Sequence, residues 1–158
     1  MYRKITKNLY LGDYMSRNSD SLIDINAAEE LDQSSDLSQQ KLFMNPIKTE
    51  ENVQYFSFPF PDFIFTDQKI NIQQIKEILK LLDYYINLKD ENVYLHCVQG
   101  INRSASVAFM FCVINNIVDN NNFETAFTAF KTIYPEIEPT PGWELFLKKR
   151  FPYKNLVS

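Results

Sequence analysis

Residues 93–104 read VYLHCVQGINRS and lead directly into a long apolar stretch. Residues 93–96 form a short apolar run that follows the polar turn KDEN, and this predicts a buried strand. Residues 104–117 are apolar on nearly all sides, which predicts a central helix covered by other elements. Cys97 therefore ends the strand, and Arg103, with five residues between them, stands at the start of the helix.

The connection between this strand and this helix has the composition of an anion-binding loop. Gly100 lets the loop turn its backbone N–H groups inward, and the helix start adds free N–H groups and the positive end of its dipole. Arg103 adds a planar fork of donors that matches phosphate oxygens. An oxyanion bound there would lie close to the Cys97 sulfur, and the same positive field would stabilise its thiolate. Ser104 could donate a hydrogen bond to that sulfur and improve it as a leaving group.

Composition limits the number of domains, the partners and the compartment that are expected for this chain. The chain has 158 residues, 45% hydrophobic and 23% charged, which predicts one globular domain over residues 1–158. The net charge of −4 makes a nucleic-acid partner unexpected. Two cysteines, Cys97 and Cys112, are too few for a disulfide framework and favour a reducing, cytoplasmic compartment. No apolar run approaches the ~20 residues of a membrane span, so no membrane partner is expected. Residues 1–12 lack an apolar signal core, so no secretion is expected.

Strands and helices are predicted to alternate along the chain. Strands are expected at residues 9–12, 21–26 and 53–58, and a loop-rich insert with one short helix at 27–52. Apolar spacing predicts a helix at 72–86, Asn121 is placed to cap a helix that runs to 133, and Thr140-Pro141 opens a last helix to about residue 150. This order predicts an α/β domain with a short central mixed sheet flanked by helices.

The segment HC-x2-G-x2-RS, with Cys97 and Arg103 as C-x5-R, resembles the signature of the cysteine-dependent dual-specificity protein phosphatases of the protein tyrosine phosphatase superfamily. Four other segments are similar to that family: ITKNLYLGDY, SLIDIN with AAEE, FPFPDF and TPGWELFL. The resemblance covers most of the chain except about residues 33–52, and it implies a protein tyrosine phosphatase-like fold. The G-x-N-R-S pattern is similar to that of poxvirus-type members, which raises a viral origin.

The resemblance implies a two-step mechanism without metal or cofactor. Cys97 would attack phosphorus and form a phosphocysteine, and Arg103 would stabilise the transition state together with backbone N–H groups of the loop. Ser104 would assist the sulfur. The implied phosphate-binding loop comprises Val98, Gln99, Gly100, Ile101, Asn102 and Arg103.

The general acid is expected to be an aspartate in or after FPFPDF. Local pattern favours Asp62, which follows a strand and a proline, whereas distance along the chain slightly favours Asp67. Asp67 could instead cap the following helix. Phe63 and Phe65, beside the expected acid, are either flanks for a substrate ring or core anchors of that loop. Thr140 stands where the family commonly has an asparagine that supports the phosphate loop, and its hydroxyl is expected to substitute in part.

The single histidine raises a cysteine–histidine protease as an alternative. Neighbours in a strand point to opposite faces, so His96 and Cys97 are poorly placed to make a nucleophile–base contact. We expect His96 to be a buried hydrogen-bonding residue that braces the phosphate loop. Cys112 is expected to pack in the core, and the alternative is that it captures an oxidised Cys97 as a disulfide.

The implied substrates are phosphorylated proteins carrying phosphotyrosine and phosphoserine or phosphothreonine. One alternative is an RNA 5′-phosphatase, which has a similar Asn-Arg pair, although the acidic charge disfavours it. Phosphoinositides rank lower because residues 98–102 contain no basic side chain. A non-catalytic phosphopeptide-binding module is the remaining alternative, and the presence of Cys97 counts against it. The sequence does not predict an oligomeric state.

Overall fold

The computed structural model describes residues 1–32 and 45–157. These residues form one six-stranded mixed sheet with the strand order β1-β2-β6-β3-β5-β4. Strands β2, β6, β3 and β5 run parallel, while β1 and β4 pair antiparallel at the two edges. The strands are β1 Tyr2–Thr6, β2 Leu9–Gly12, β3 Ile23–Asn26, β4 Lys48–Glu50, β5 Val53–Ser57 and β6 Val93–His96. The mixed α/β sheet is therefore confirmed.

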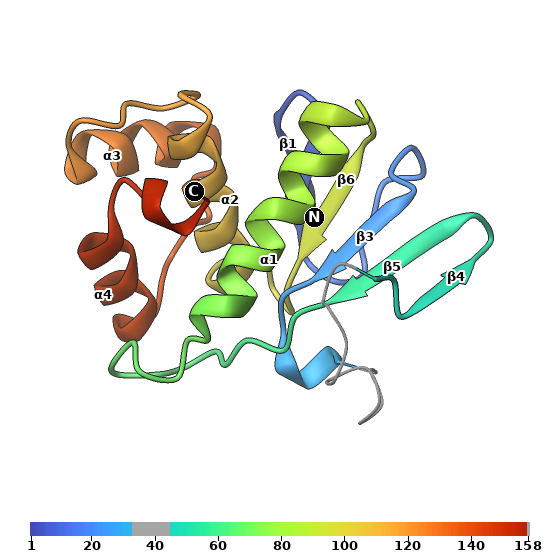
Figure 1. The fold of residues 1–158 in the computed structure, drawn as a ribbon, viewed down its shortest axis with the longest axis horizontal. Coiled ribbons are helices and arrows are strands. Elements are labelled where there is room, and N and C mark those ends of the chain that lie inside the picture. The colour runs from blue at the N-terminus through green and yellow to red at the C-terminus, as the bar shows by residue number, and fades with distance from the viewer. Residues whose placement is uncertain (33–44, 158) are drawn as a thin grey trace.

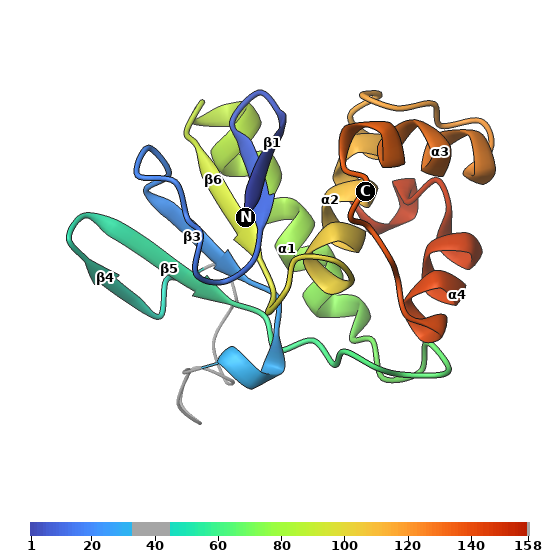
Figure 2. The same ribbon diagram turned by 180° about the vertical axis from the view of Figure 1, so that it is seen from behind.

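Helices α1 to α4 gather on one side of the sheet (Figures 1 and 2). Every residue of α2 from Arg103 to Val113 is buried, which confirms the prediction of a covered central helix. The helices are α1 Ile72–Leu82, α2 Arg103–Ile114, α3 Phe123–Ile133 and α4 Pro141–Arg150, with a π-helix η3 Asp83–Leu88 and short 3-10 turns η1 Glu29–Leu31 and η4 Lys154–Leu156.

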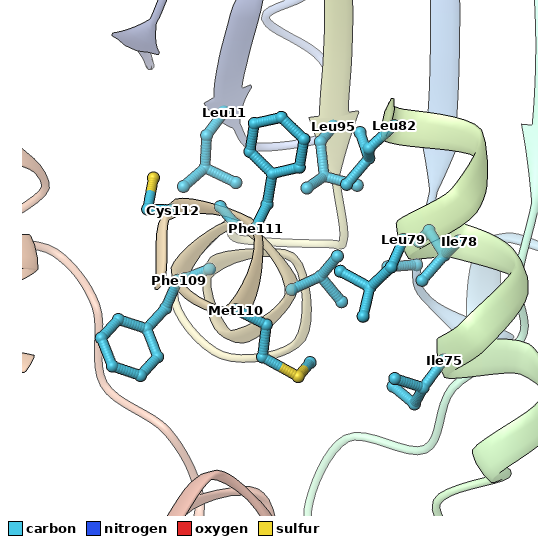
Figure 3. Packing of buried hydrophobic residues seen from close by; sticks show 14 of the residues in the cluster. Leu11, Ile75, Ile78, Leu79, Leu82, Leu95, Phe109, Met110, Phe111 and Cys112 are labelled. Carbon is cyan, nitrogen blue, oxygen red and sulfur yellow. The ribbon is translucent and has the colours of Figure 1, made fainter. Parts of the chain in front are cut away.

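Successive side chains of a strand point to opposite faces of the sheet, and those on the helix side form the core between the sheet and these helices. Leu95 of β6 and Leu11 of β2 face α2, whose Phe109 and Phe111 pack into the same cluster as Leu79 of α1 (Figure 3). The alternate strand positions, Asp24, Asn26, Tyr94 and His96 among them, are also buried but mostly polar. Burial of the apolar set, at about 25 cal/mol per Å², is the main force that holds α2 and its N-terminal loop in place.

Two edge strands were not predicted from the sequence. All three residues of β4 are exposed, and so are the first three of β1, so neither strand shows a full apolar alternation. Residues 27–52 were expected to form a loop-rich insert with one short helix. They contain η1 and β4, and the part of that prediction at residues 33–44 lies outside the described residues.

Helix ends also differ from the expected ones. The helix expected to reach residue 86 is an α-helix only to Leu82 and continues as η3, and α2 ends at Ile114 rather than 117. The expected cap Asn121 is wrong by one residue. The side chain of Asn122 accepts from the amide of Thr125 at 3.1 Å and caps α3.

The parallel strands β3, β5 and β6 place the three loops that follow them at the same end of the sheet, beyond the carboxyl ends of the strands. In the register of β3, β5 and β6, Asn26 lies beside both Ser57 and His96. The loop after each of these three strands begins at this end of the sheet, because the carboxyl ends of parallel strands lie side by side. Residues 27–31, 58–62 and 97–102 are therefore neighbours, although they are far apart in the sequence.

Candidate active site

The loop from Cys97 to Arg103 joins β6 to α2, and its carbonyl groups point outward. Four of its carbonyls accept hydrogen bonds from neighbouring groups: Val98 from the amide of Tyr14 (3.2 Å), Gly100 from the hydroxyl of Tyr134 (2.7 Å), Ile101 from the amide of Glu138 (2.7 Å) and Asn102 from the amide of Ser106 (2.8 Å). In a trans peptide the following N–H points opposite to the C=O. The amides of residues 99, 101, 102 and 103 therefore face the centre of the loop. Within residues 1–32 and 45–157 the amides of residues 98–103 donate to no backbone carbonyl.

Gly100 sits in this loop with φ of +77°, a conformation that a side chain disfavours. A Cβ at this position would also lie 2.5 Å from the carbonyl carbon of Gly12 and 2.6 Å from its oxygen. Backbone strain and lack of space thus both require glycine here. The close approach packs the loop directly against the end of β2.

Cys97 lies at the base of the loop and is 2% exposed. Ser104, on the first turn of α2, donates from its hydroxyl to the Cys97 sulfur at 3.2 Å. His96 is buried, with Nε2 2.8 Å from Oδ1 of Asp24 and Nδ1 3.1 Å from the carbonyl of Cys97. Both ring nitrogens of His96 therefore have other partners, so neither is free to take a proton from the Cys97 sulfur.

Arg103 is 1% exposed, and its guanidinium carries five N–H donors. Nη1 and Nη2 donate to the two carboxylate oxygens of Glu30, the latter at 2.8 Å, and Nη1 also donates to the carbonyl of Phe60 at 2.9 Å. These three bonds leave Nε–H and one Nη2–H, which lie on the same edge of the group. The Nε atom is buried and has no hydrogen-bond partner among the described residues. The remaining pair forms a fork of the shape that binds two phosphate oxygens.

Two residues that line the pocket, Glu30 and Glu138, were not predicted from the sequence, and Glu30 is the one that contacts Arg103. The hydrogen bond from Arg103 lowers the pKa of Glu30, so the carboxylate stays ionised. Burial, the largest single effect, lowers the pKa of Arg103. The hydrogen bonds that Arg103 donates to Glu30 and the negative charges of Asp62, Cys97 and Glu30 together outweigh it, so the pKa is raised. The available signal was topological: a carboxylate just after β3 lies beside whatever follows its parallel neighbour β6.

Asp62 lies above the loop and is fixed to it by Asn102. The Asn102 amide nitrogen donates to the Asp62 carboxylate at 2.8 Å and to its carbonyl at 3.1 Å. Thr140 donates from its hydroxyl to the same Asp62 carbonyl at 2.9 Å and accepts from Asn102 at 3.2 Å. Thr140 is the N-cap residue of α4, but this side chain does not cap the helix, because it connects the two loops instead.

Asp67 is placed elsewhere. Its carboxylate pairs with Lys149 of α4 at 3.3 Å and does not line the pocket around Cys97. Helix α1 is capped by Asn71, whose side chain accepts from Gln74, so the capping alternative for Asp67 is wrong as well. Of the two expected aspartates, only Asp62 faces the loop.

The segment that carries Asp62 is anchored by α4. Trp143 is buried and donates from Nε1 to the carbonyl of Pro61 at 2.8 Å, and the amide of Gly142 donates to the carbonyl of Ile64 at 2.7 Å. Ile64 is the buried residue of this segment, whereas Phe63 and Phe65 are 64% and 74% exposed. The core-anchor alternative for these two phenylalanines is therefore wrong.

Cys112 belongs to the core and not to this site (Figure 3). Burial raises the pKa of its thiol to about 12. Its position on α2 is eight residues beyond Ser104. At 1.5 Å per residue that is roughly 12 Å along the helix. Because Ser104 contacts the Cys97 sulfur, the two cysteines are beyond the reach of a disulfide, whose Cα atoms lie at most about 7 Å apart.

These groups surround one small pocket of about 190 Å³. It is lined by Cys97, Val98, Gln99, Ile101, Asn102, Arg103, Glu30, Asp62, Glu138 and Thr140. A sulfur, a fork of buried donors, inward-facing amides and a carboxylate thus meet within a space the size of a phosphate group and its first substituent. This arrangement can bind a tetrahedral oxyanion against the sulfur.

No protein-family model and no curated protein sequence matches this chain. Its structure is similar to solved structures over nearly the full length. DUSP15 matches with a TM-score of 0.71 and 16% identity, covering 98% of this chain and 89% of that one. Human DUSP28 matches with 0.68 and 14%, covering 98% and 95%. A mouse putative dual specificity phosphatase complexed with zinc tungstate matches with 0.68 and 13%, covering 99% and 91%.

The chain therefore has the α/β fold of solved dual-specificity phosphatases. In the part of the chain that the structure describes, no helix is long and apolar enough to cross a membrane.

Proposed function

We propose that this chain is a metal-independent protein phosphatase that hydrolyses phosphotyrosine and phosphoserine or phosphothreonine through a phosphocysteine. The observation that carries the proposal is the donor arrangement around Cys97. The loop amides face inward. Glu30 and Phe60 accept three of the five Arg103 N–H groups, and the buried Nε forms no hydrogen bond, although it lies 3.5 Å from the Asp62 carboxylate. Donors fixed in place before the reaction stabilise the charge that develops on phosphate oxygens.

In the first step the Cys97 thiolate attacks phosphorus. The sulfur–phosphorus bond forms, the bond from phosphorus to the substrate oxygen breaks, and that oxygen leaves with the electron pair. Asp62, held above the loop by Asn102 at 2.8 Å, donates a proton to it. The hydroxyl of Ser104, 3.2 Å from the sulfur, stabilises the thiolate as nucleophile and later as leaving group.

In the second step the Asp62 carboxylate takes a proton from a water molecule that attacks the phosphocysteine. The new oxygen–phosphorus bond forms, the sulfur–phosphorus bond breaks, and Cys97 leaves as a thiolate. Inorganic phosphate is released and the protonated Asp62 is ready for another cycle. His96 and Thr140 act as positioning residues, His96 through the Cys97 carbonyl and Thr140 through Asn102 and Asp62.

The substitution Cys97→Ser tests the covalent mechanism. Turnover should be lost, while a phosphotyrosine peptide still binds with measurable affinity by calorimetry, because the loop amides and Arg103 are unchanged. Substantial residual turnover in this variant would exclude the phosphocysteine.

A parallel panel in EDTA tests the substrate class with wild-type protein. It comprises a phosphotyrosine peptide, a phosphothreonine peptide, a 5′-triphosphate RNA and a phosphoinositide. We expect both peptides to be hydrolysed. Preferential hydrolysis of the RNA would favour the RNA 5′-phosphatase instead, and binding without any turnover would favour a non-catalytic phosphopeptide-binding module.

A further inference from the structure

The charges around the pocket are unusual for a site that binds a dianion. Three carboxylates line it, from Glu30, Asp62 and Glu138, against one cation, Arg103. Glu30 is neutralised by its paired contact with Arg103. Asp62 is protonated when it acts as the proposed general acid. Glu138 then remains as an unmatched negative charge at the rim of the pocket.

Glu138 is held at the rim by its backbone and not by its side chain. Its amide donates to the carbonyl of Ile101 at 2.7 Å, which fixes the residue to the phosphate loop. Its side chain is exposed and forms no ion pair within residues 1–32 and 45–157. The neighbouring Glu136, by contrast, is paired with Arg3 at 2.7 Å. The backbone of Glu138 is thus held in place while its carboxylate is exposed and can contact a bound molecule.

The position of that molecule is fixed independently of Glu138. The buried Nε of Arg103, a residue that lines the pocket, lies 3.5 Å from the Asp62 carboxylate but has no hydrogen-bond partner in the described part of the chain, so its N–H points to an anionic ligand. Once a phosphorylated residue is anchored there, its chain neighbours pass over the rim. Consecutive residues of a peptide are 3.8 Å apart at Cα, so the side chains within two positions of the phosphorylated residue can reach Glu138.

Resting on the proposed function, we propose that this phosphatase selects substrates with an arginine or lysine within two residues of the phosphorylated one, and that Glu138 recognises that basic residue. The basic side chain offsets the repulsion between Glu138 and the phosphate dianion and forms an ion pair with the carboxylate. An acidic residue at the same place adds a second repulsion. Polyanionic substrates are disfavoured for the same reason.

The test uses phosphotyrosine peptides that differ at a single position. That position is one of the two residues before or the two residues after the phosphotyrosine, and it carries Arg, Gln or Glu. We expect wild-type kcat/KM to be roughly threefold to tenfold higher for the Arg peptide than for the Glu peptide, since exposed ion pairs are individually weak. The ratio should fall as the salt concentration rises, because salt screens exposed charges. Equal values for the Arg, Gln and Glu peptides at all four positions would overturn the proposal.

Variants assign the effect to one residue. Glu138→Gln should reduce the Arg-to-Glu ratio to near one, and Glu138→Lys should invert it. Glu124→Gln makes the same charge change on an exposed part of α3, which does not line the pocket, and should keep the wild-type ratio. A ratio that survives in Glu138→Gln would refute the role of Glu138.

Each ratio is taken within one variant, so a general loss of activity or folding does not affect it. The two proposals fail in different ways. If no phosphopeptide is hydrolysed by the wild-type protein, the proposed function is wrong. If all are hydrolysed without discrimination, the phosphatase function stands and only the inference about Glu138 is wrong.

Discussion

The side chain of Asn102 bonds to the carboxylate of Asp62 at 2.8 Å and so connects two loops that are 40 residues apart in the sequence. One loop carries the proposed nucleophile and the other the proposed acid. Thr140 contacts both partners of this bond. The relative position of Cys97 and Asp62 therefore depends on a few polar contacts, and each of them can be tested.

Asp62→Asn should slow the turnover of phosphotyrosine and phosphothreonine substrates by roughly 10²–10⁴-fold, because an amide cannot donate the catalytic proton. The loss should be largest for phosphothreonine, whose alkoxide leaving group needs that proton most. It should shrink for an aryl phosphate with a very acidic leaving group, which departs without one. Steady-state kinetics with a series of leaving groups measures this dependence, and the basic limb of the pH–rate profile should disappear.

Asp67→Asn is the matched control. It removes the contact with Lys149 but no group that lines the pocket, so the leaving-group dependence should remain that of the wild type. The opposite pattern, with the dependence altered by Asp67→Asn and not by Asp62→Asn, would move the role of general acid to Asp67. A dependence that neither variant alters would mean that the enzyme needs no protein acid.

Thr140→Val should lower kcat for phosphothreonine more than for an activated aryl phosphate. Valine keeps the shape of threonine but loses the donor to the Asp62 carbonyl and the acceptor for Asn102, so the acid is less well positioned. Thr140→Ser keeps the hydroxyl and should restore most of the activity. If Thr140→Ser is as impaired as Thr140→Val, the hydroxyl is not the group that matters.

Arg103→Lys should reduce kcat by roughly 10²–10³-fold, about 3 kcal/mol or more of transition-state stabilisation. A lysine ammonium cannot make the paired contacts to Glu30 and to two phosphate oxygens at once. Single-turnover rates together with peptide affinity separate the chemical step from binding. A rate within a few-fold of wild type would place Arg103 away from the phosphate.

The stability of the fold should depend on pH through Glu30. The pKa of Glu30 lies below its ordinary value of 4.5 because Arg103 donates to the carboxylate. A carboxyl group with a lowered folded pKa stabilises the protein above its unfolded pKa, and this contribution is lost as the pH falls through the folded value. Thermal unfolding between pH 7 and pH 3 should therefore show a steeper acid-side decrease in Tm for wild type than for Glu30→Gln.

Glu29→Gln provides the comparison for that experiment. Glu29 is the exposed neighbour of Glu30 and forms no ion pair in the described residues. Its substitution should leave the pH dependence of Tm close to that of the wild type. Identical curves for wild type and Glu30→Gln would show that the pair with Arg103 contributes nothing to stability.

The parts of the structure that the sequence predicted are those with dense local signals. Val93–His96 and the helix after it were predicted because almost every residue in them is buried, which gives both segments a mostly apolar sequence. The C-x5-R motif lies within the single loop that joins them. The exposed edge strand β4, with the sequence KTE, has no apolar pattern to recognise. β4 is a strand because its backbone pairs with β5, and backbone pairing does not require particular side chains that the sequence could reveal.

The contacts that complete the site are encoded in tertiary structure. Glu30 reaches Arg103 across 73 positions of the sequence, and an acidic residue in a loop is ordinarily read as solvated. The choice between Asp62 and Asp67 was similarly open, since the sequence cannot say which carboxylate turns toward Asn102 and which toward Lys149. Only the packing of α4 against this segment decides it.

The outward carbonyls of the loop have a consequence for when its order is acquired. Tyr14 belongs to the connection between β2 and β3, and Tyr134 and Glu138 belong to the connection between α3 and α4. Together these residues fix the loop peptides as the chain folds. The conformational entropy of those peptides is thus lost on folding and not on binding. The loop is therefore already ordered before an oxyanion binds. An oxyanion at concentration [L] that binds only the folded state adds RT ln(1 + [L]/Kd) to the free energy of unfolding of the whole protein. Substituting Tyr134, whose hydroxyl holds a carbonyl and faces no substrate, should therefore appear as weaker oxyanion affinity.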